Sequence, residues 1–388
     1  MLMPAFGPEE YRKRTARLRQ QMAEFCTDAL LVLNESNMNY LTGYDGYSEY
    51  VPQLALVCQD EEDPWLILRE MDVACATTTS YLPQSRILGY PERYIGSNQR
   101  TPWQPIGDMI RERTKSSRIG IELSAKVYGI KAHAALGKSL DLARSSDADG
   151  MISKLKLLKS PAELAYMEQA GKIVDRAMQV GRLGVAVGAR HCDVAASITH
   201  ALITGTPEFP GGPSRILFPT MPVGSPATAP HIKWADGRYA KGCQTNFEIG
   251  AFRYRYCCAL SRTVFLGEPP ARSRHVHQAA VDGFQAAFET MRPGVTCGDV
   301  ERAFRRTFNP RGVRKESRIG YSIGIDWPDG GASLQDDDQT IIQPNMAFHL
   351  IIGVWEKGDG YVFSETVRLA DDGAKSLSSL PRDLLVNA

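Results

Sequence analysis

Three segments carry polar groups where a half-buried strand would ordinarily carry apolar ones. They place His231 after a loop rich in glycine and proline, Glu248 within the apolar run 247–250, and Glu365 within the apolar run 363–367. A buried carboxylate without a partner is costly, so each glutamate must face water or meet a positive group. Strand alternation does not say which. Two such strands and a proton-transferring histidine in one predicted sheet domain favour a shared pocket.

The strands that must position these residues lie in the C-terminal part of the chain. Segments 246–267, 346–356 and 361–369 have the lengths and turns of antiparallel strands, in a sheet that helices cover on one side. A faint internal repeat relates 184–198 to 294–304, where Gly-Val precedes a short loop and Asp-Val then opens a helix. The pattern predicts a duplicated α+β domain.

A domain boundary is predicted just before a long helix. The lysine-rich connector 153–159 runs into Ser160 as N-cap, Pro161 at the first helical position and Glu163, which completes a capping box. Upstream, helical and strand patterns alternate to about residue 150, which is typical of an α/β domain. We therefore predict an N-terminal domain over 1–151 and a catalytic domain over 152–388.

Composition excludes several classes of protein. The chain has 388 residues, of which 43% are hydrophobic, and a formal net charge of +1. That length predicts two domains, and the near-zero charge gives no field to attract nucleic acid or anionic lipid. No apolar run approaches a membrane span, and the N-terminal residues carry charges where a signal peptide would be apolar. We expect a cytoplasmic protein without a nucleic-acid or membrane partner.

The eight cysteines and one tyrosine-rich loop complete the candidates. The cysteines are scattered, without zinc spacing, and are expected to be reduced thiols. Residues 34–50 are dense in Asn, Gly, Ser and Tyr, which is turn chemistry. Tyr44 and Tyr47 there either belong to a plain surface loop or line a pocket.

The chain resembles the pita-bread family of methionine aminopeptidase, aminopeptidase P, prolidase and creatinase. The resemblance covers nearly the whole chain: a smaller N-terminal α/β domain, a connector helix introduced by a Lys-Ser-Pro-Glu run, and a duplicated catalytic domain. It implies an α+β fold with a C-terminal pita-bread domain. In the peptidases two metal ions are held by Asp, Asp, His, Glu and Glu. The matching positions here are Glu248, Ala259, Tyr321, Ile351 and, at or beside the last position, Glu365.

Ala, Tyr and Ile at three of these positions predict that no dinuclear metal site forms, because each ion needs several oxygen or nitrogen ligands. His349 is a candidate substitute ligand, but we expect it to point away from the face that carries Ile351. A metallopeptidase is therefore disfavoured. We expect no metal and no other cofactor.

Within the family the chain is similar to the metal-free ectoine hydrolase branch. The matching motifs are residues 37–46, 230–231, 248–250, 253–256, 260–263, 320–324 and 364–365. One departure is the loop 326–332, which lacks an arginine that the branch usually carries there. Creatinase, a metal-free member that also uses a catalytic histidine, carries a glutamate where Ser261 stands here. That difference argues against creatine as substrate.

The resemblance implies hydrolysis of a cyclic amidine. A protonated amidine carries its charge on the carbon to be attacked, so a metal dication beside it would repel it, whereas carboxylates would attract it. Glu248 and Glu365 would hold the amidinium, water or Glu248 would attack, and His231 would transfer protons. Ring opening of ectoine would yield an N-acetylated diaminobutyrate.

The remaining substrate contacts are less specific. Candidates are Tyr44, Tyr47, Ser261, Tyr321 and Arg253. Further possible partners of a substrate carboxylate are Arg255, Arg318 and Arg262. For Tyr321 the alternative is simple space filling. Creatinase-type members place the N-terminal domain of one subunit over the active site of the other. The resemblance therefore implies a homodimer.

Other functions remain open at this stage. The substrate could be hydroxyectoine, another amidine or guanidine, or a cyclic amide. Alternatively the chain could be a non-catalytic binding member of the fold, although the retained His231, Glu248 and Glu365 speak against that. A metal-dependent peptidase or lyase predicts bound iron, zinc or manganese.

Overall fold

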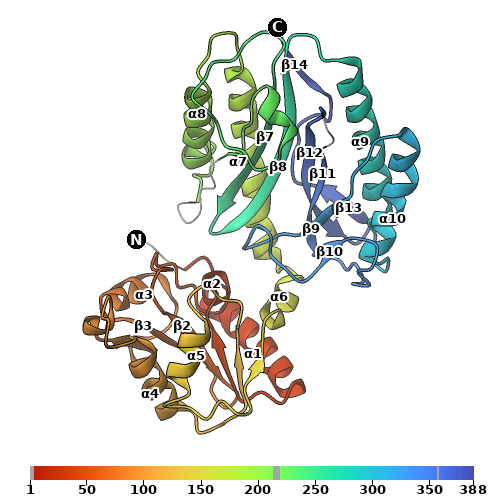
Figure 1. The fold of residues 1–388 in the computed structure, drawn as a ribbon. Coiled ribbons are helices and arrows are strands. Elements are labelled where there is room, and N and C mark those ends of the chain that lie inside the picture. The colour runs from red at the N-terminus through yellow and green to blue at the C-terminus, as the bar shows by residue number, and fades with distance from the viewer. Residues whose placement is uncertain (1–3, 213–218, 356–357) are drawn as a thin grey trace. The chain divides into compact units, whose positions relative to one another are not determined.

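A computed structural model describes residues 4–212, 219–355 and 358–388. The chain divides into two compact units, residues 1–155 and 156–388 (Figure 1). The boundary predicted from the sequence lies between residues 151 and 152, and helix α6 (Met151–Lys156) spans the interval between the two boundaries. None of the described helices has the length and apolar character that a membrane span requires.

The N-terminal unit is built on a six-stranded mixed sheet in the order β4-β3-β2-β1-β5-β6. The central strand β1 is antiparallel to β2 and parallel to β5, and all of its residues are buried. The strands are β1 (Ala29–Val32), β2 (Leu54–Cys58), β3 (Trp65–Arg69), β4 (Ile87–Tyr90), β5 (Ile119–Ile121) and β6 (Ser146–Asp147). The helices are α1 (Pro8–Glu24), α2 (Glu35–Thr42), α3 (Val73–Thr79), α4 (Trp103–Arg113) and α5 (Ile130–Leu136).

The C-terminal unit is built on an eight-stranded sheet in the order β10-β9-β11-β12-β8-β14, with β7 paired to β8 and β13 to β12. All of its pairings are antiparallel except that of β14 with β8. The strands are β7 (Gln244–Arg253), β8 (Tyr256–Leu266), β9 (Gly320–Ser322), β10 (Ser333–Leu334), β11 (Ala347–Val354), β12 (Tyr361–Ala370), β13 (Gly373–Ser376) and β14 (Leu385–Asn387).

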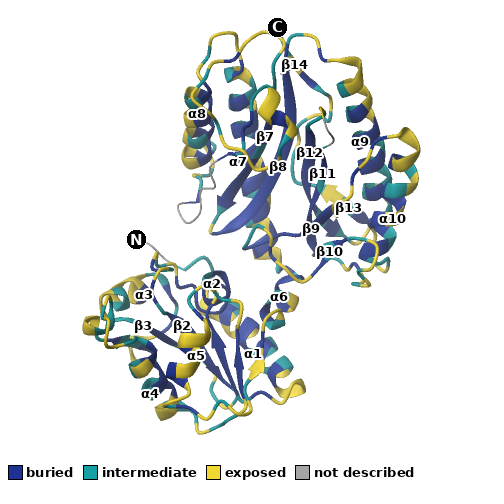
Figure 2. Ribbon diagram, in the orientation of Figure 1, coloured by how far each residue is buried: buried dark blue, intermediate teal, exposed yellow. Residues whose placement is uncertain are grey.

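Four long helices cover one face of this sheet: α7 (Pro161–Gly184), α8 (His191–Thr204), α9 (Ala271–Thr290) and α10 (Cys297–Phe308). The first pair packs on β7 and β8 and the second pair on β11 and β12, and each pair buries its own apolar cluster. Figure 1 shows the two pairs on either side of the sheet centre, and Figure 2 shows the strands between them buried. The predicted antiparallel sheet, covered by helices on one side, is confirmed.

Capping explains where two of these helices begin. Ser160 accepts a hydrogen bond from the Glu163 backbone N–H while Glu163 accepts one from the Ser160 N–H, so the predicted capping box is present. Thr296 and Asp299 form the same motif at the start of α10. The two capping boxes determine where α7 and α10 begin, and with these starting points the apolar faces of both helices pack against the sheet.

Candidate active site

The strand register brings polar side chains together on the sheet face that the four helices leave uncovered. Glu248 pairs with Ser261, Ser261 with Ser364, and Ser364 with Ile351, so one row of side chains crosses β7, β8, β12 and β11 on a single face. The next row on the same face contains Gly250, Ala259, Thr366, His349 and Tyr321. We call the side chains of Glu248, Ser261, Ser364, His349 and Tyr321 the polar face.

Glu248 is the carboxylate of this face. It lies in β7, whose outer edge is paired to the segment around Thr220, and its side chain is partly exposed. Burial raises the pKa of Glu248, while the nearby His231 charge and a hydrogen bond from the Thr220 side chain act in the opposite direction. Burial thus makes the Glu248 carboxylate bind a proton more tightly than an ordinary glutamate, and a positive group beside it opposes that effect.

The loop that carries His231 lies beside Glu248, close enough for the His231 charge to act on that carboxylate. Residues 220–224 run along the edge of β7, through hydrogen bonds between Thr220 and Glu248 and between Gly224 and Gln244. The Met221 N–H then donates to the Ile232 carbonyl at 2.8 Å, which folds the loop back beside Glu248. His231 itself is exposed and has a left-handed φ of 59°, a conformation that costs a non-glycine residue energy and is often found at functional sites.

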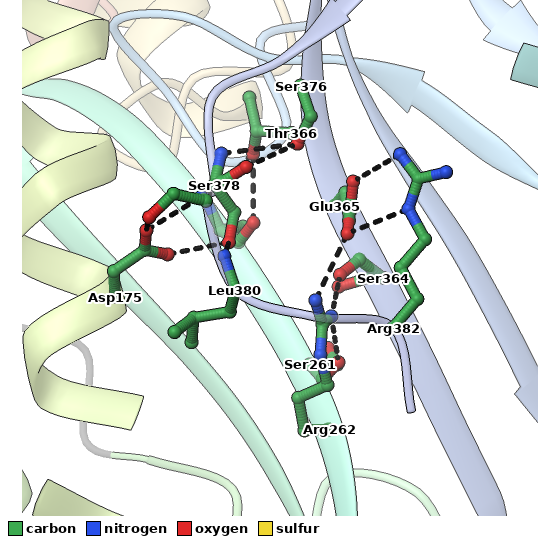
Figure 3. A network of polar contacts seen from close by, with 12 residues as sticks. Asp175, Ser261, Arg262, Ser364, Glu365, Thr366, Ser376, Ser378, Leu380 and Arg382 are labelled. Atoms are coloured by element: carbon green, nitrogen blue, oxygen red, sulfur yellow. Dashed lines mark hydrogen bonds and ion pairs between the residues drawn. The ribbon is translucent and has the colours of Figure 1, made fainter. Parts of the chain in front are cut away.

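The structure does not bring Glu365 to this site. It alternates with Ser364 along β12 and therefore points to the helix-covered face. Its Oε1 accepts from Arg262 Nη2 at 3.0 Å and its Oε2 from Arg382 Nη2 at 3.1 Å. Figure 3 shows Glu365 between these two guanidinium groups. The prediction that Glu365 holds the substrate does not fit this placement, because its charge is already matched and Ser364 occupies the corresponding position on the polar face.

The Glu365 network fastens the C-terminal segment to the sheet. Arg382 lies beyond β13, and on the same segment Ser378 Oγ donates to Asp175 Oδ1 of α7 at 2.6 Å (Figure 3). Glu365 and Arg262 are almost completely buried. The geometry assigns Glu365 a structural role, in which one buried carboxylate joins β8, β12 and the C-terminal segment.

A hydrogen-bonded chain crosses the polar face from a loop to the sheet centre. Trp327 Nε1 donates to Tyr321 Oη at 2.9 Å, Tyr321 Oη lies 3.1 Å from His349 Nδ1, and His349 Nε2 lies 2.8 Å from Ser364 Oγ. His349 is fully buried, and burial lowers its pKa to about 3. It is therefore a neutral imidazole with a single N–H at neutral pH.

The expected orientation of His349 was wrong. His349 and Ile351 are two residues apart in β11 and therefore share a face, which the pairings of His349 with Tyr321 and of Ile351 with Ser364 confirm. Sequence reasoning also missed Trp327 and Ser364. Strand alternation from Ile351 could have identified His349, but no local signal pointed to Trp327, which reaches the face from a loop.

Buried charges hold the loop that carries Trp327. Lys156 Nζ contacts Asp326 Oδ2 at 3.1 Å and Asp329 Oδ1 at 3.0 Å, and Lys159 Nζ contacts Asp329 Oδ2 at 3.3 Å. The Trp327 ring lies against Gly250, where an added Cβ would be 2.6 Å from the ring. Lys156 and Lys159 thus hold in place the loop whose Trp327 ring packs beside the polar face.

The other predicted contacts have varied positions. Ser261 is on the polar face, and its buried Oγ has no hydrogen-bond partner among the described residues. Arg253 lies on the helix side, where it donates to Gln169 of α7 at 3.1 Å, so the prediction that it binds substrate does not fit. In the N-terminal unit Tyr44 is 3% exposed and donates to Gln53, whereas Tyr47 is 83% exposed. Tyr44 is therefore not an exposed loop tip.

The residues present do not fit a dinuclear metal site. The resemblance assigns the ligand positions to Glu248, Ala259, Tyr321, Ile351 and Glu365, but Glu365 points to the helix side and Ser364 takes its place on the polar face, so Glu248 is the one carboxylate left among them. Within the ranges that the structure describes, the one compact trio of possible ligands is Cys58, Asp60 and Glu61, in the N-terminal unit. Burial raises the pKa of the Cys58 thiol to about 12, and Glu61 already pairs with Arg86, so this trio is a poor site as well.

Comparisons with known proteins agree with this architecture. Residues 165–372 match Metallopeptidase family M24, and residues 14–157 match the Creatinase/Prolidase N-terminal domain. The chain is 36% identical over 386 residues to the uncharacterized hydrolase/peptidase y4tM of Sinorhizobium fredii, which covers 98% of both chains. It is 32% identical over 396 residues to an ectoine hydrolase of Halomonas elongata, again covering 98% of both chains.

Solved structures show the same fold. A prolidase from Thermococcus sibiricus superposes with a TM-score of 0.85 at 19% identity, and the match covers 98% of this chain and 100% of that chain. A Xaa-Pro dipeptidase from Bacillus anthracis gives a TM-score of 0.81 at 18% identity, covering 97% and 99%. The expected pita-bread fold, with its separate N-terminal domain, is confirmed.

Proposed function

The chain belongs to metallopeptidase family M24, and within that family we propose that it is a metal-independent hydrolase that opens a cyclic amidine ring. The proposed substrate is ectoine and the product is N-acetyl-diaminobutyrate. The full-length similarity to an ectoine hydrolase supports this choice. The observation that carries it is that Glu248 lies within electrostatic reach of His231 on a face where three of the other family ligand positions hold Ala259, Tyr321 and Ile351.

Charge matching favours a monocation as substrate. Because Arg262 and Arg382 neutralise Glu365, Glu248 supplies the negative charge at this face. A protonated amidine carries one positive charge and donates N–H bonds to a carboxylate, and the charge-assisted bonds offset the burial of both groups. The rings of Trp327 and Tyr321 add aromatic faces that attract cations.

The chemistry then follows from the charge on the substrate. The amidinium carbon is already electrophilic, so water, or Glu248 itself, attacks it without a Lewis acid. His231 takes a proton from the water that attacks the substrate, or that hydrolyses the Glu248 adduct, and a proton returns from His231 to the departing amine as the ring opens. A covalent Glu248 adduct trapped by rapid quench and detected by mass spectrometry would identify attack by Glu248. Label from H₂¹⁸O in the Glu248 carboxylate after a single turnover would then show that water cleaves the adduct at the carboxyl carbon.

Arg318 is the best candidate for the substrate carboxylate. Its exposed guanidinium stacks over the Tyr321 ring at 4.4 Å and donates to Ser333 Oγ at 3.1 Å. Arg253 and Arg262 both point to the helix side. A carboxylate held at Arg318 would place the rest of a small amidine acid over Tyr321.

The test is NMR of ectoine incubated with chelator-treated protein. We expect conversion to N-acetyl-diaminobutyrate at an unchanged rate after chelation. Glu248→Gln should abolish it, while Glu365→Gln, a matched substitution on the other face, should turn over at a temperature where it is folded. Activity that depends on a restored stoichiometric metal ion would refute metal independence, and normal turnover by Glu248→Gln would refute the assignment of the site.

Substrate range and assembly are tested separately. Hydroxyectoine, creatine and a cyclic amide, assayed alongside ectoine, distinguish the amidine proposal from its alternatives. We also propose a homodimer in which the exposed Tyr47 loop of one subunit contributes to the site of the other. Light scattering tests the dimer, and Tyr47→Ala should then raise KM without altering the mass.

A further inference from the structure

The hydrogen-bonded series Trp327–Tyr321–His349–Ser364 connects side chains that differ in their exposure to solvent. Ser364 and His349 are fully buried, whereas Tyr321 is partly exposed on the same face as Glu248. Glu248 acts electrostatically on the Tyr321 phenol, and burial raises the pKa of that phenol to about 12, so Tyr321 keeps its proton. Within this hydrogen-bonded series, the neutral Tyr321 hydroxyl is thus the group accessible to a ligand beside the proposed substrate site.

The direction of the hydrogen bonds decides what Tyr321 offers to a ligand. The indole N–H of Trp327 can only donate, so the Tyr321 oxygen accepts there. If Tyr321 donated its hydrogen to His349, the hydroxyl would present only a lone pair to the site. If instead His349 Nδ1 carries the imidazole proton, Tyr321 accepts from both neighbours and its own hydrogen points away from them.

Two features favour the second arrangement. The negative carboxylate of Glu248 draws the phenol hydrogen toward its side. In addition, His349 Nε2 faces Ser364 Oγ at 2.8 Å, and a hydroxyl there can donate to an unprotonated nitrogen.

We propose that His349 is a positioning residue, whose Nδ1–H donates to Tyr321 Oη and thereby directs the Tyr321 hydroxyl hydrogen toward the substrate beside Glu248. This inference rests on the proposed function. A protonated amidine presents N–H groups and no free lone pair. Addition at its carbon ends the delocalisation and returns lone pairs to the ring nitrogens, so a hydroxyl donor gains a partner only as the adduct forms. Such an interaction accelerates the reaction without tightening substrate binding.

The tautomer can be measured without any substrate. In the protein labelled with ¹⁵N-histidine, the His349 signals are identified by their loss in H349N. We expect a protonated Nδ1, an unprotonated Nε2 and no titration between pH 5 and pH 8. A protonated Nε2 would overturn the proposal.

Two substitutions separate the two ends of the imidazole. In H349N the amide group reaches the place of Nδ1 and can still donate to Tyr321, whereas in H349Q it reaches the place of Nε2 and contacts Ser364 instead. We expect Y321F and H349Q each to lower kcat by about 10- to 100-fold with little change in KM. H349N should be about tenfold faster than H349Q, and Y321F/H349Q about as slow as Y321F alone.

The contradicting outcomes are equally specific. Equal losses in H349N and H349Q, or multiplied losses in the double variant, would indicate a purely structural histidine. His277 provides a matched control, because its Nδ1 lies 2.7 Å from Tyr361 Oη on the helix side. H277N and H277Q should have indistinguishable kcat values. If the wild-type protein does not convert ectoine, the proposed function fails, while the ¹⁵N spectrum still decides the tautomer.

Discussion

Replacing Glu365 with glutamine tests whether the carboxylates of β7 and β12 have different tasks. Glu365 is 1% exposed and accepts from Arg262 at 3.0 Å and from Arg382 at 3.1 Å. Glutamine keeps the shape but leaves the Arg262 guanidinium, which is 2% exposed, without a counter-charge. Removing one partner of a buried ion pair costs about 3–5 kcal/mol.

That cost predicts a clear thermal effect. A domain of about 150–250 residues loses about 2–4 °C of Tm for each kcal/mol, so the C-terminal unit should melt about 6–20 °C lower. The assay is calorimetry or denaturant unfolding, with turnover measured at low temperature on the folded variant. We expect kcat and KM to stay near the wild-type values there.

Two results would refute this reasoning. One is a Glu365→Gln variant with wild-type stability, because the buried pair would then contribute nothing. The other is a stable variant that has lost turnover, because Glu365 would then act in the reaction. A double variant, Arg262→Met with Glu365→Leu, should recover part of the lost stability because it leaves no unpaired buried charge.

Three further predictions concern the polar face. Burial raises the pKa of Glu248, so the acidic limb of the kcat/KM profile should lie at a higher pH than the pKa of an ordinary glutamate. The Thr220 hydroxyl lowers the Glu248 pKa, so Thr220→Val should move this limb to still higher pH. A limb that Thr220→Val leaves in place would contradict this. Since the raised pKa means that the folded state binds the Glu248 proton more tightly, the wild type loses stability as pH rises through that pKa. Glu248→Gln should therefore be the more stable protein at pH 7, with the difference vanishing at acidic pH in denaturant titrations. Gly250→Ala should displace Trp327, costing about 1–3 kcal/mol of stability and raising KM, and unchanged KM would show that the ring does not border the substrate.

Local patterns in the sequence were sufficient for much of the fold. The capping box of Ser160 and Glu163 starts α7, and the alternation of apolar residues predicts the strands of the second sheet. His231, Glu248 and Glu365 were proposed as one site from their residue types and their place in the chain, and in the structure His231 acts on Glu248 while Glu365 lies on the other face. Each of these signals depends on residues close in sequence, or on a motif whose order along the chain is retained.

The face that each strand turns to the site could not be read in the same way. Glu365 and Ser364 are adjacent, and pairing with Ser261, about a hundred residues earlier, decides which of the two meets Glu248. Arg382 reaches Glu365 only because the C-terminal segment folds back on the sheet. Neighbouring residues determine helix ends and strand periodicity, but the sign of the charge that a buried group meets depends on segments that only folding brings together.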